Sequence, residues 1–284
     1  MQICTTIEEL RTIRWYNPNQ SWGLVPTMGY LHAGHLALVK RARAENDRVA
    51  VSIYVNPTQF APNEDLSSYP RDLDKDLALL RAEGVDLVFT PDDPVMYPAG
   101  FQTYVAVENV TKLLEGASRP THFQGVTTVV AKLFNIIQPI RAYFGQKDAQ
   151  QTVVIKQMVG DLNFNVEVII CPIVREADGL ALSSRNKYLN PAERRAALVL
   201  WGALGEAYNH YTKGERDANK LRQLMRSIIE AEPLARLDYV SVADAGTLQE
   251  LNTIEDGNVL QPTILLSTAV YIGKTRLIDN ILIE

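Results

Sequence analysis

The chain has 284 residues, of which 46% are hydrophobic and 21% are charged, an ordinary composition for a globular protein that excludes wholesale disorder, collagen-like repeats and a coiled coil. Its 28 Lys and Arg residues against 33 Asp and Glu residues leave a net charge of −5. No nucleic-acid partner is therefore expected, and any anionic ligand must be held by a local cluster of donors.

Targeting and membrane signals are not expected either. The first ten residues have no basic stretch and already contain Glu8 and Glu9, unlike a secretory signal. Apolar stretches such as 196–204 are far shorter than the roughly 20 residues of a membrane helix. Cys4 and Cys171 lack CxxC spacing, so we expect reduced thiols in a cytoplasmic protein, although the sequence leaves one bridge between them open.

Short β-branched runs alternate with amphipathic runs over the first two-thirds of the chain. In chain order the sequence predicts a strand over 22–26, a helix over 34–46, a strand over 48–55, a helix over 70–83, a strand over 85–89, a helix over 125–138, a strand over 141–144, a helix over 148–160 and a strand over 166–170. This alternation predicts an α/β fold with a Rossmann-like parallel sheet, which binds ligands outside the carboxyl ends of its strands.

The pattern changes after about Pro172. Helices are predicted over 191–212 and 217–232, followed by strands over 237–242, 263–270 and 275–283 in a hairpin-rich arrangement. We therefore expect a Rossmann-like nucleotide-binding domain over 1–173 and a smaller C-terminal α+β domain over 174–284 that acts as a lid.

The sharpest segment is PTMGYLHAGH, residues 26–35, between the first strong strand and the first strong helix. Gly29 and Gly34 permit close backbone approach, and His35 falls in the first helical turn, where free N–H groups favour phosphate. His32 and His35 could thus donate hydrogen bonds to a polyphosphate. The simpler alternative is a strand–turn–helix corner in which the two side chains form hydrogen bonds with nearby backbone groups. A zinc site is a weaker reading, because the spacing is not HExxH and no nearby ligand set completes it.

Two further segments combine polar and charged residues at element ends. FGQKD (144–148) ends a strand and is followed by Gln151; Lys147 can neutralise phosphate, and Asp148 is expected to cap the next helix. LSSRN (182–186) places small polar residues around Arg185, and by itself would be read as a turn. The chain has neither a GxxxxGK[ST] loop nor a GxGxxG fingerprint, so P-loop and dinucleotide-oxidoreductase readings lose their main support.

Other polar segments indicate ligand or metal contacts less strongly. NPTQF (56–60) follows a strand end and faces the expected crevice, and RPTHFQG (119–125) is another possible anion contact. Asp72, Asp74 and Asp76 are more typical of a solvated helix surface than of a metal site.

Five ordered motifs together resemble one family. PTMGYLHAGH looks like the HxGH signature of the nucleotidyltransferases, and with VNPTQF (55–60), HFQGV (122–126), FGQKD and LSSRN it resembles the pantoate–β-alanine ligases over essentially the whole chain. The resemblance implies an ATP-dependent ligation. Pantoate would attack the ATP α-phosphate to give pantoyl adenylate and pyrophosphate, and the amine of β-alanine would then displace AMP.

The resemblance also implies roles for individual residues. The catalytic residues would be His32, His35 (the proton donor), Lys147 at the α-phosphate and Arg185. Gln59 and Gln151 would hold pantoate, with Gln59 also beside β-alanine. ATP would be bordered by Met28, Gly29, Tyr30, Leu31, His32, Ala33, Gly34, His35, Gly145, Gln146, Lys147, Asp148 at the ribose, Val174 at adenine, and Leu182, Ser183, Ser184 and Arg185 over the phosphates.

The remaining implications concern metal, assembly and departures from the pattern. Mg²⁺ would accompany ATP, with Asp76 as the candidate neighbour, and the chain would form a homodimer. Gln146 stands where the family commonly has Glu, and Leu182 where many members have Met; neither change removes a catalytic group.

Two alternatives stay open at this point. One is another nucleotidyltransferase of the same fold that acts on a phosphate acceptor, against which the two glutamines favour a small hydroxy acid. The other is a nucleotide-binding regulator without turnover, against which the joint presence of His32, His35, Lys147 and Arg185 argues.

Overall fold

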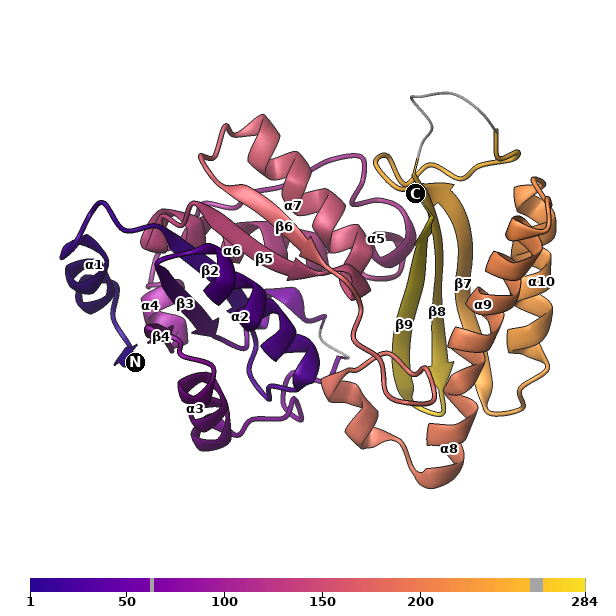
Figure 1. Ribbon diagram of the computed structural model, residues 1–284, viewed down its shortest axis with the longest axis horizontal. Helices are drawn as coiled ribbons and strands as arrows, with labels where there is room; N and C mark the ends of the chain where they lie inside the picture. The colour runs from indigo at the N-terminus through magenta and orange to yellow at the C-terminus, as the bar shows by residue number, and fades with distance from the viewer. Residues whose placement is uncertain (62–63, 256–262, 284) are drawn as a thin grey trace.

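A six-stranded parallel sheet forms the N-terminal half of the molecule (Figure 1). The computed structural model describes residues 1–61, 64–255 and 263–283. The strand order is β1-β4-β3-β2-β5-β6, so the chain builds β3 and β4 on one side of β2 and later returns to place β5 on the other. The strands are Gln2–Cys4 (β1), Trp22–Thr27 (β2), Arg48–Ile53 (β3), Leu87–Phe89 (β4), Arg141–Gly145 (β5) and Glu167–Cys171 (β6).

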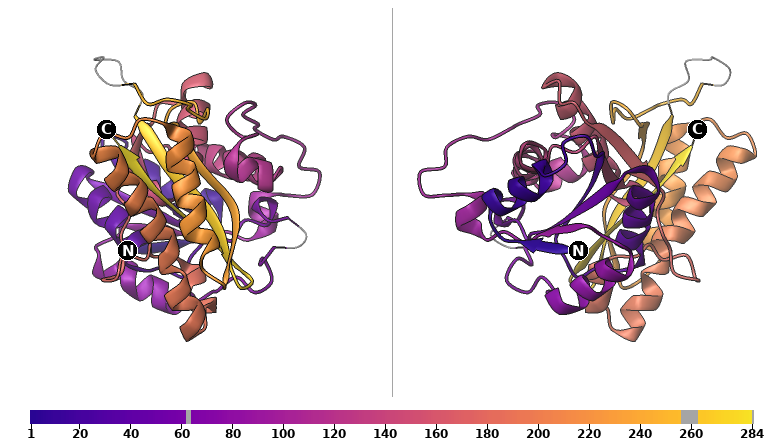
Figure 2. Two further views of the ribbon diagram at one scale, coloured as in Figure 1. Left: turned by 90° about the vertical axis from the view of Figure 1, so that its right-hand side faces the viewer. Right: turned by 60° about the vertical axis from the view of Figure 1, so that its left-hand side comes forward.

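Helices cover both faces of this sheet (Figures 1 and 2). One face packs against α1 (Ile7–Trp15), α6 (His122–Ile137) and α7 (Ala149–Asp161), and the other against α2 (Ala33–Glu45) and α3 (Leu73–Ala82). Coverage on both faces explains why the strands read as continuous apolar runs rather than as alternating ones.

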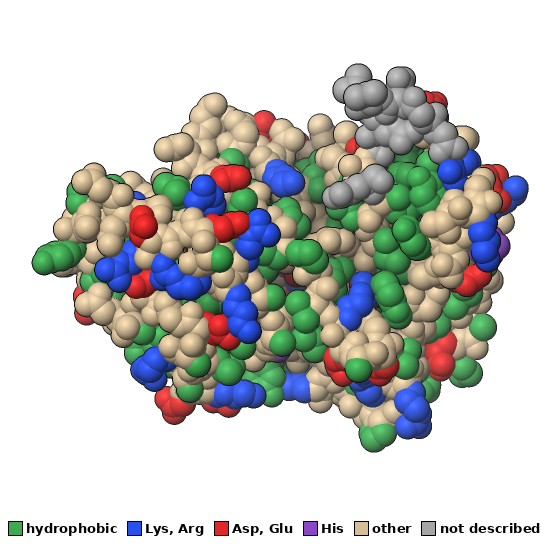
Figure 3. Space-filling view, in the orientation of Figure 1, with side chains coloured by type: hydrophobic (Ala, Val, Ile, Leu, Met, Phe, Trp, Pro, Cys, Tyr) green, Lys and Arg blue, Asp and Glu red, His purple; other side chains and the backbone are tan. Residues whose placement is uncertain are grey.

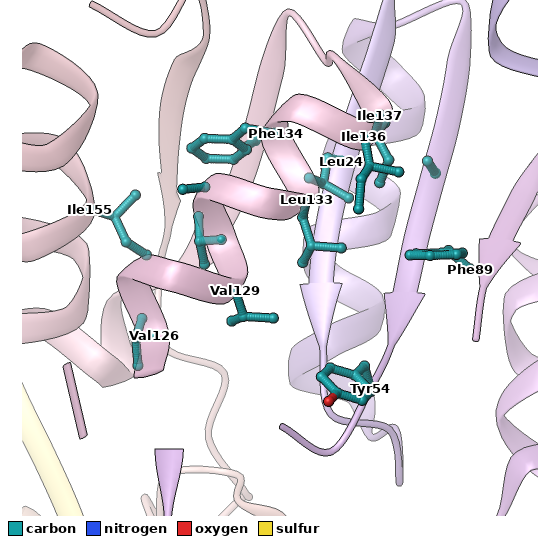
Figure 4. Close-up of a cluster of buried hydrophobic side chains, with 14 of the residues drawn as sticks. Leu24, Tyr54, Phe89, Val126, Val129, Leu133, Phe134, Ile136, Ile137 and Ile155 are labelled. Carbon is teal, nitrogen blue, oxygen red and sulfur yellow. The ribbon is translucent and has the colours of Figure 1, made fainter. Parts of the chain in front are cut away.

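The helix α6 supplies much of the core on its side of the sheet. Its side chains Val126, Val129 and Leu133 belong to the same buried cluster as Leu24 of β2 and Phe89 of β4 (Figure 4). Burial of each such side chain contributes about 1.5–3 kcal/mol. The start of α6 is thereby fixed relative to the strand ends.

A second, antiparallel sheet forms the C-terminal part. It has the order β7 (Ala235–Asp244), β8 (Ile264–Ile272) and β9 (Thr275–Ile283). The helices α9 (Leu198–Thr212) and α10 (Ala218–Glu230) pack on one of its faces with a separate hydrophobic cluster (Figure 1). Short elements complete the chain: α4 (Asp93–Met96), α5 (Leu114–Ser118), α8 (Pro191–Ala196) and the 3₁₀ turns η1 (Pro57–Gln59), η2 (Gln146–Asp148) and η3 (Ser184–Tyr188).

The predicted fold class is confirmed, and each predicted strand and helix of the first sheet is found with ends shifted by a few residues. The prediction of one helix over 191–212 is wrong. The hydrogen-bond ladder changes locally at the buried Ala197, where the Leu200 N–H donates to the Ala197 carbonyl, and this divides the segment into α8 and α9. Neither β1 nor α1 is among the elements predicted from the sequence, although Thr6 and Glu9 form a capping box at the start of α1.

The surface and the cysteines agree with the composition argument. Charges of both signs are mixed over the face shown in Figure 3. Cys4 and Cys171 are buried free thiols. Within the described ranges, no helix combines the length and the apolar character needed to cross a bilayer.

Candidate active site

A cavity of about 1290 Å³ lies where the strand order reverses between β2 and β5. Its walls come from the segments that follow β2 and β5, from the start of α6, and from residues 273–280 of the second sheet. At such a reversal the chain leaves the two neighbouring strands towards opposite faces of the sheet, here into α2 and α7, and the crevice between the two connections is the expected ligand site of an open parallel sheet.

The loop after β2 is held in an unusual backbone conformation. Gly29 and Tyr30 have φ values of 81° and 52°. The N–H groups of Tyr30 and Leu31 each donate to a carboxylate oxygen of the fully buried Asp76, both at 2.7 Å. A Cβ at Gly29 would lie 2.9 Å from Ile53 Cγ2, so glycine is required there. The structure therefore gives Asp76 the role of a clamp on this loop.

His32 and His35 cap α2 reciprocally. His32 Nδ1 accepts from the Gly34 N–H at 3.1 Å, and His35 Nδ1 accepts from the His32 N–H at 3.3 Å. Gly34 is needed for this arrangement, because a Cβ there would lie 2.9 Å from the His32 ring. A backbone N–H can only donate, so both Nδ1 atoms are unprotonated and the proton of each ring is on Nε2. The HxGH spacing thus produces two neutral imidazoles that donate through Nε2.

The electrostatic surroundings keep both rings neutral. Burial, with the charge of Lys147 as the next cause, lowers the pKa of His32 to about 4. Burial, together with His32 and Lys147, lowers the pKa of His35 to about 3. His35 and Lys147 line the same cavity, so the segments after β2 and β5 meet, as the motif positions predict.

The Lys147 loop is anchored by the second sheet. The buried Asn280 of β9 donates through Nδ2 to the carbonyls of Gln146 and Lys147, each at 3.0 Å, and its Oδ1 accepts from Gln146 Nε2 at 3.2 Å. The expectation that the Asp148 side chain caps α7 is wrong: Asp148 occupies the N-cap position without a side-chain capping bond. The 3₁₀ turn η2 leads directly into α7, so the backbone lacks the extended N-cap conformation that capping requires.

The turn that carries Gln59 is packed tightly against α6. A Cβ on Gly125 would lie 2.3 Å from the Thr58 carbonyl oxygen, and Asn56 Nδ2 donates to the Gly125 carbonyl at 3.2 Å. The Gln59 side chain is buried at the cavity wall, and its amide makes no hydrogen bond to another residue in the described part of the chain. The Gln151 side chain lines the same cavity.

Both cavity arginines that the sequence analysis considered are engaged with acidic residues. Arg185 pairs with Asp65 through Nη2 at 2.8 Å and Nε at 3.1 Å, which leaves Nη1 without a hydrogen bond among the described residues. Arg119 pairs with Glu64 through two contacts of 2.6 Å. Arg119 is therefore a neutralised wall residue rather than an open anion contact.

The cavity brings together many, but not all, of the predicted site residues. Those that line it are Met28, His35, Gln59, Lys147, Asp148, Gln151, Ser183 and Arg185. His32 is stacked on His35 with ring centroids 4.1 Å apart. The described lining does not include Gly29, Tyr30, Leu31, His32, Ala33, Gly34, Gly145, Gln146, Val174, Leu182 or Ser184.

Several wall residues were missed by the sequence analysis. Glu115 of α5 is buried and pairs with Arg276 of β9 at 2.6 and 2.8 Å, while Tyr239 of β7 donates to Glu115 at 3.0 Å. These contacts hold the second sheet against the first at the cavity. Buried polar residues within apolar strands, such as Asp279 and Asn280, were the available signal.

The described residues contain no group of three or more His, Cys, Asp or Glu side chains that could hold a metal ion. The zinc hypothesis for His32 and His35 also disagrees with the geometry, because both Nδ1 atoms accept from backbone N–H groups and the ring protons therefore occupy Nε2, which leaves neither ring nitrogen free for a metal.

Comparisons with known proteins identify the family of this chain. The family model for pantoate-beta-alanine ligase matches residues 2–282. A pantothenate synthetase of Roseiflexus sp. (strain RS-1) is 61% identical over 284 residues, with 100% of both chains covered, and one of Chloroflexus aurantiacus is 59% identical over 285 residues, with 100% and 99% covered.

Solved structures give the same result. Pantothenate synthetase of Thermus thermophilus superposes with a TM-score of 0.92 at 48% identity, with 99% of each chain covered. A pantoate-beta-alanine ligase of Francisella tularensis, solved in complex with beta-gamma ATP and beta-alanine, superposes with a TM-score of 0.77 at 38% identity, covering 99% of this chain and 97% of that one. The chain therefore belongs to the pantoate-beta-alanine ligase family.

Proposed function

We propose that this chain ligates pantoate and β-alanine at the expense of ATP, through a pantoyl adenylate, with release of AMP and pyrophosphate. The observation that carries the proposal is the convergence of His35, Lys147, Arg185 and two glutamines on one cavity at the strand-order reversal. Family membership favours this ligation over a phosphate-acceptor transferase or a regulator without turnover.

In the first step a carboxylate oxygen of pantoate forms a bond to the α-phosphorus of ATP, and the bond from that phosphorus to the bridging oxygen of pyrophosphate breaks. This displacement requires positioning and charge stabilisation but no nucleophilic side chain. The Nε2–H group of His35 and the ammonium of Lys147 would supply donors to the phosphate oxygens from the cavity wall, and the Nε2–H group of His32, stacked on His35, would add a donor where the phosphates extend beyond that wall.

We expect Mg²⁺ to enter with ATP, since divalent cations neutralise transferring phosphates. The described protein residues do not fit a metal site of their own: no three-ligand group is present, and both Asp76 oxygens already accept backbone N–H groups. The ion would be held by the phosphates of the nucleotide, and we assign no step to a protein-bound ion.

We place the reaction in the cytoplasm, where ATP is available, and in a homodimer. The candidate dimer surface is the extended segment 101–108, where Tyr104 is 52% exposed. Backbone N–H groups of 102–104 donate to no residue in the described part of the chain. Unpaired backbone donors of this kind are available to a second copy of the chain, and a sedimentation mass of one chain would contradict the assembly.

The direct test is product analysis with pantoate, β-alanine, ATP and Mg²⁺. We expect AMP and pantothenate in equal amounts, and no AMP when pantoate is omitted. AMP formation that does not depend on pantoate would contradict the proposed substrate.

Alanine at Gln59 or Gln151 should impair the use of pantoate more than the binding of ATP. Both side chains line the cavity. Loss of one buried polar partner costs roughly 1–3 kcal/mol, or about 5- to 160-fold in KM for pantoate. ATP affinity, measured without pantoate, should stay close to that of the unmodified chain. If ATP affinity fell as much as the use of pantoate, these glutamines would contact the nucleotide rather than pantoate.

Alanine at Arg185 should weaken adenylation and leave the fold intact. We infer that residues 174–284 close over the nucleotide, so that Arg185 adds its free Nη1 edge to the phosphates and water is excluded. Pantoate-dependent pyrophosphate exchange measures the effect, with the exposed Arg195→Ala as control. Unchanged exchange in Arg185→Ala would show that this guanidinium does not reach the phosphates.

The free energy of unfolding should fall as the pH is lowered from 7 to 5. The folded-state pKa values of His32 and His35 are about 4 and 3, below the 6.5 of an unfolded histidine, so the unfolded chain binds more protons in this window. Each such ring costs up to about 1.4 kcal/mol per pH unit below 6.5. Urea unfolding should show that His35→Asn loses less unfolding free energy between pH 7 and pH 5 than the unmodified chain does. An equal loss in the two chains would contradict the assignment of a neutral His35 ring.

A further inference from the structure

His122, the first residue of α6, is the one histidine of the described cavity lining that the proposed chemistry leaves without a role. It lines the same cavity as Gln59, Lys147 and Gln151. Its Nδ1 lies 2.9 Å from the carbonyl oxygen of Gln59. A carbonyl oxygen only accepts, so Nδ1 must carry the proton and donate it to this bond.

The protonation state of His122 follows from its surroundings. Burial, together with the charge of Arg119, lowers the pKa of His122 to about 4, although the backbone contact to Gln59, Glu115 and Glu64 oppose the shift. Both carboxylates are themselves paired, Glu64 with Arg119 and Glu115 with Arg276. The ring is therefore neutral at pH 7, with its proton on Nδ1 and a lone pair on Nε2.

His122 is thus the opposite tautomer of His32 and His35. Its Nε2 makes no hydrogen bond to a described residue, and it is not among the buried polar atoms left without a partner, so it has access to the cavity. The groups assigned to the phosphates, on His35, Lys147 and Arg185, are all donors. Nε2 of His122 is a pure acceptor in the same cavity, and it suits a ligand group that carries only N–H donors.

We propose that His122 Nε2 accepts a hydrogen bond from the amine of β-alanine and aligns the nitrogen lone pair with the pantoyl carbonyl carbon. This inference rests on the ligation proposed above. The β-alanine ammonium carries only N–H donors, whereas the hydroxyls of pantoate can pair equally well with the amides of Gln59 and Gln151. The adenine amino group of ATP also only donates, but it is expected at Val174, which does not belong to the described cavity lining.

In the second step, the transfer of the pantoyl group to β-alanine, His122 accepts a hydrogen bond and positions the amine without taking part in bond making. The β-alanine ammonium loses one proton to reach the amine, the C–N bond forms, and the bond from the carbonyl carbon to the phosphate oxygen breaks with its electron pair leaving on AMP. The nitrogen loses a second proton as the amide forms. Both protons reach water, and the weakly basic imidazole is not required to keep either.

The test uses two variants of the full chain that separate the two ring nitrogens. Asparagine at 122 can keep a donor near the Nδ1 position and so keep the contact to the Gln59 carbonyl, but it has no group at Nε2. Glutamine at 122 places an amide near Nε2 and loses the Nδ1 donor. Pantoate-dependent pyrophosphate exchange reports the first step, and single-turnover transfer from preformed adenylate to β-alanine reports the second.

His122→Asn should leave exchange within about threefold of the unmodified chain and slow transfer to β-alanine by about 10- to 100-fold, the effect of one lost hydrogen bond to the reacting group. His122→Gln should recover part of the transfer rate relative to His122→Asn. Equal losses of exchange and transfer in His122→Asn, or no loss in either, would overturn the proposal. Exchange that is absent from the unmodified chain would instead refute the ligation itself.

Discussion

Alanine at Lys147 should slow pantoyl adenylate formation by about 10²- to 10³-fold, the usual cost of removing one preorganised charge-stabilising group. The Lys147 side chain forms no ion pair in the described part of the chain, and it reaches the cavity beside His32 and His35. Its ammonium is therefore available to a phosphate rather than neutralised by a carboxylate.

Two measurements check this expectation. Pantoate-dependent pyrophosphate exchange should fall in Lys147→Ala and stay unchanged in Lys156→Ala, which removes an exposed lysine from α7. NMR titration should show a higher pKa for His32 and His35 in Lys147→Ala, because the lysine charge lowers both values. Raised histidine pKa values with unchanged exchange would place Lys147 beside the rings but away from the reacting phosphate.

The part of the site that the sequence could predict is the part built by local structure. Each of the segments around His35 and Lys147 follows a strand and opens a helix, and the strand-order reversal between β2 and β5 brings two such strand ends together. Apolar periodicity locates the strands and helices, and parallel pairing places their carboxyl ends at one edge. Local pattern and known topology rules were therefore sufficient for these residues.

The rest depends on tertiary contacts that no local pattern encodes. Asn280 and Arg276 lie more than a hundred residues from Gln146 and Glu115, and their role requires the antiparallel sheet to dock on the cavity. The capping role expected of Asp148 failed because η2 runs directly into α7. Asp76 resembled a surface carboxylate, yet it is fully buried under the Tyr30 loop, which helical spacing alone does not reveal.

Alanine at Gly125 should damage both stability and the use of pantoate. The added Cβ would lie 2.3 Å from the Thr58 carbonyl oxygen and 2.8 Å from the Gln59 backbone nitrogen, so α6 and the Gln59 turn must separate. Backbone atoms cannot yield as a flexible side chain can, and overpacking of this kind costs about 1–3 kcal/mol. The displaced turn carries Gln59 with it, and a shift near 1 Å can cost about 10²-fold in rate.

Gly160 offers a matched control, because it also lies in a helix and a Cβ there would meet no atom within 4 Å. Gly160→Ala should raise the free energy of unfolding by about 0.5–1 kcal/mol, since alanine loses less backbone entropy in a helix. Urea unfolding and pyrophosphate exchange at varied pantoate concentration test both variants. If Gly125→Ala kept its stability and its KM for pantoate, the close contact between α6 and the Gln59 turn would not be what positions this amide, and the bonds that Arg119 and His122 donate to the Gln59 carbonyl would remain as its anchors.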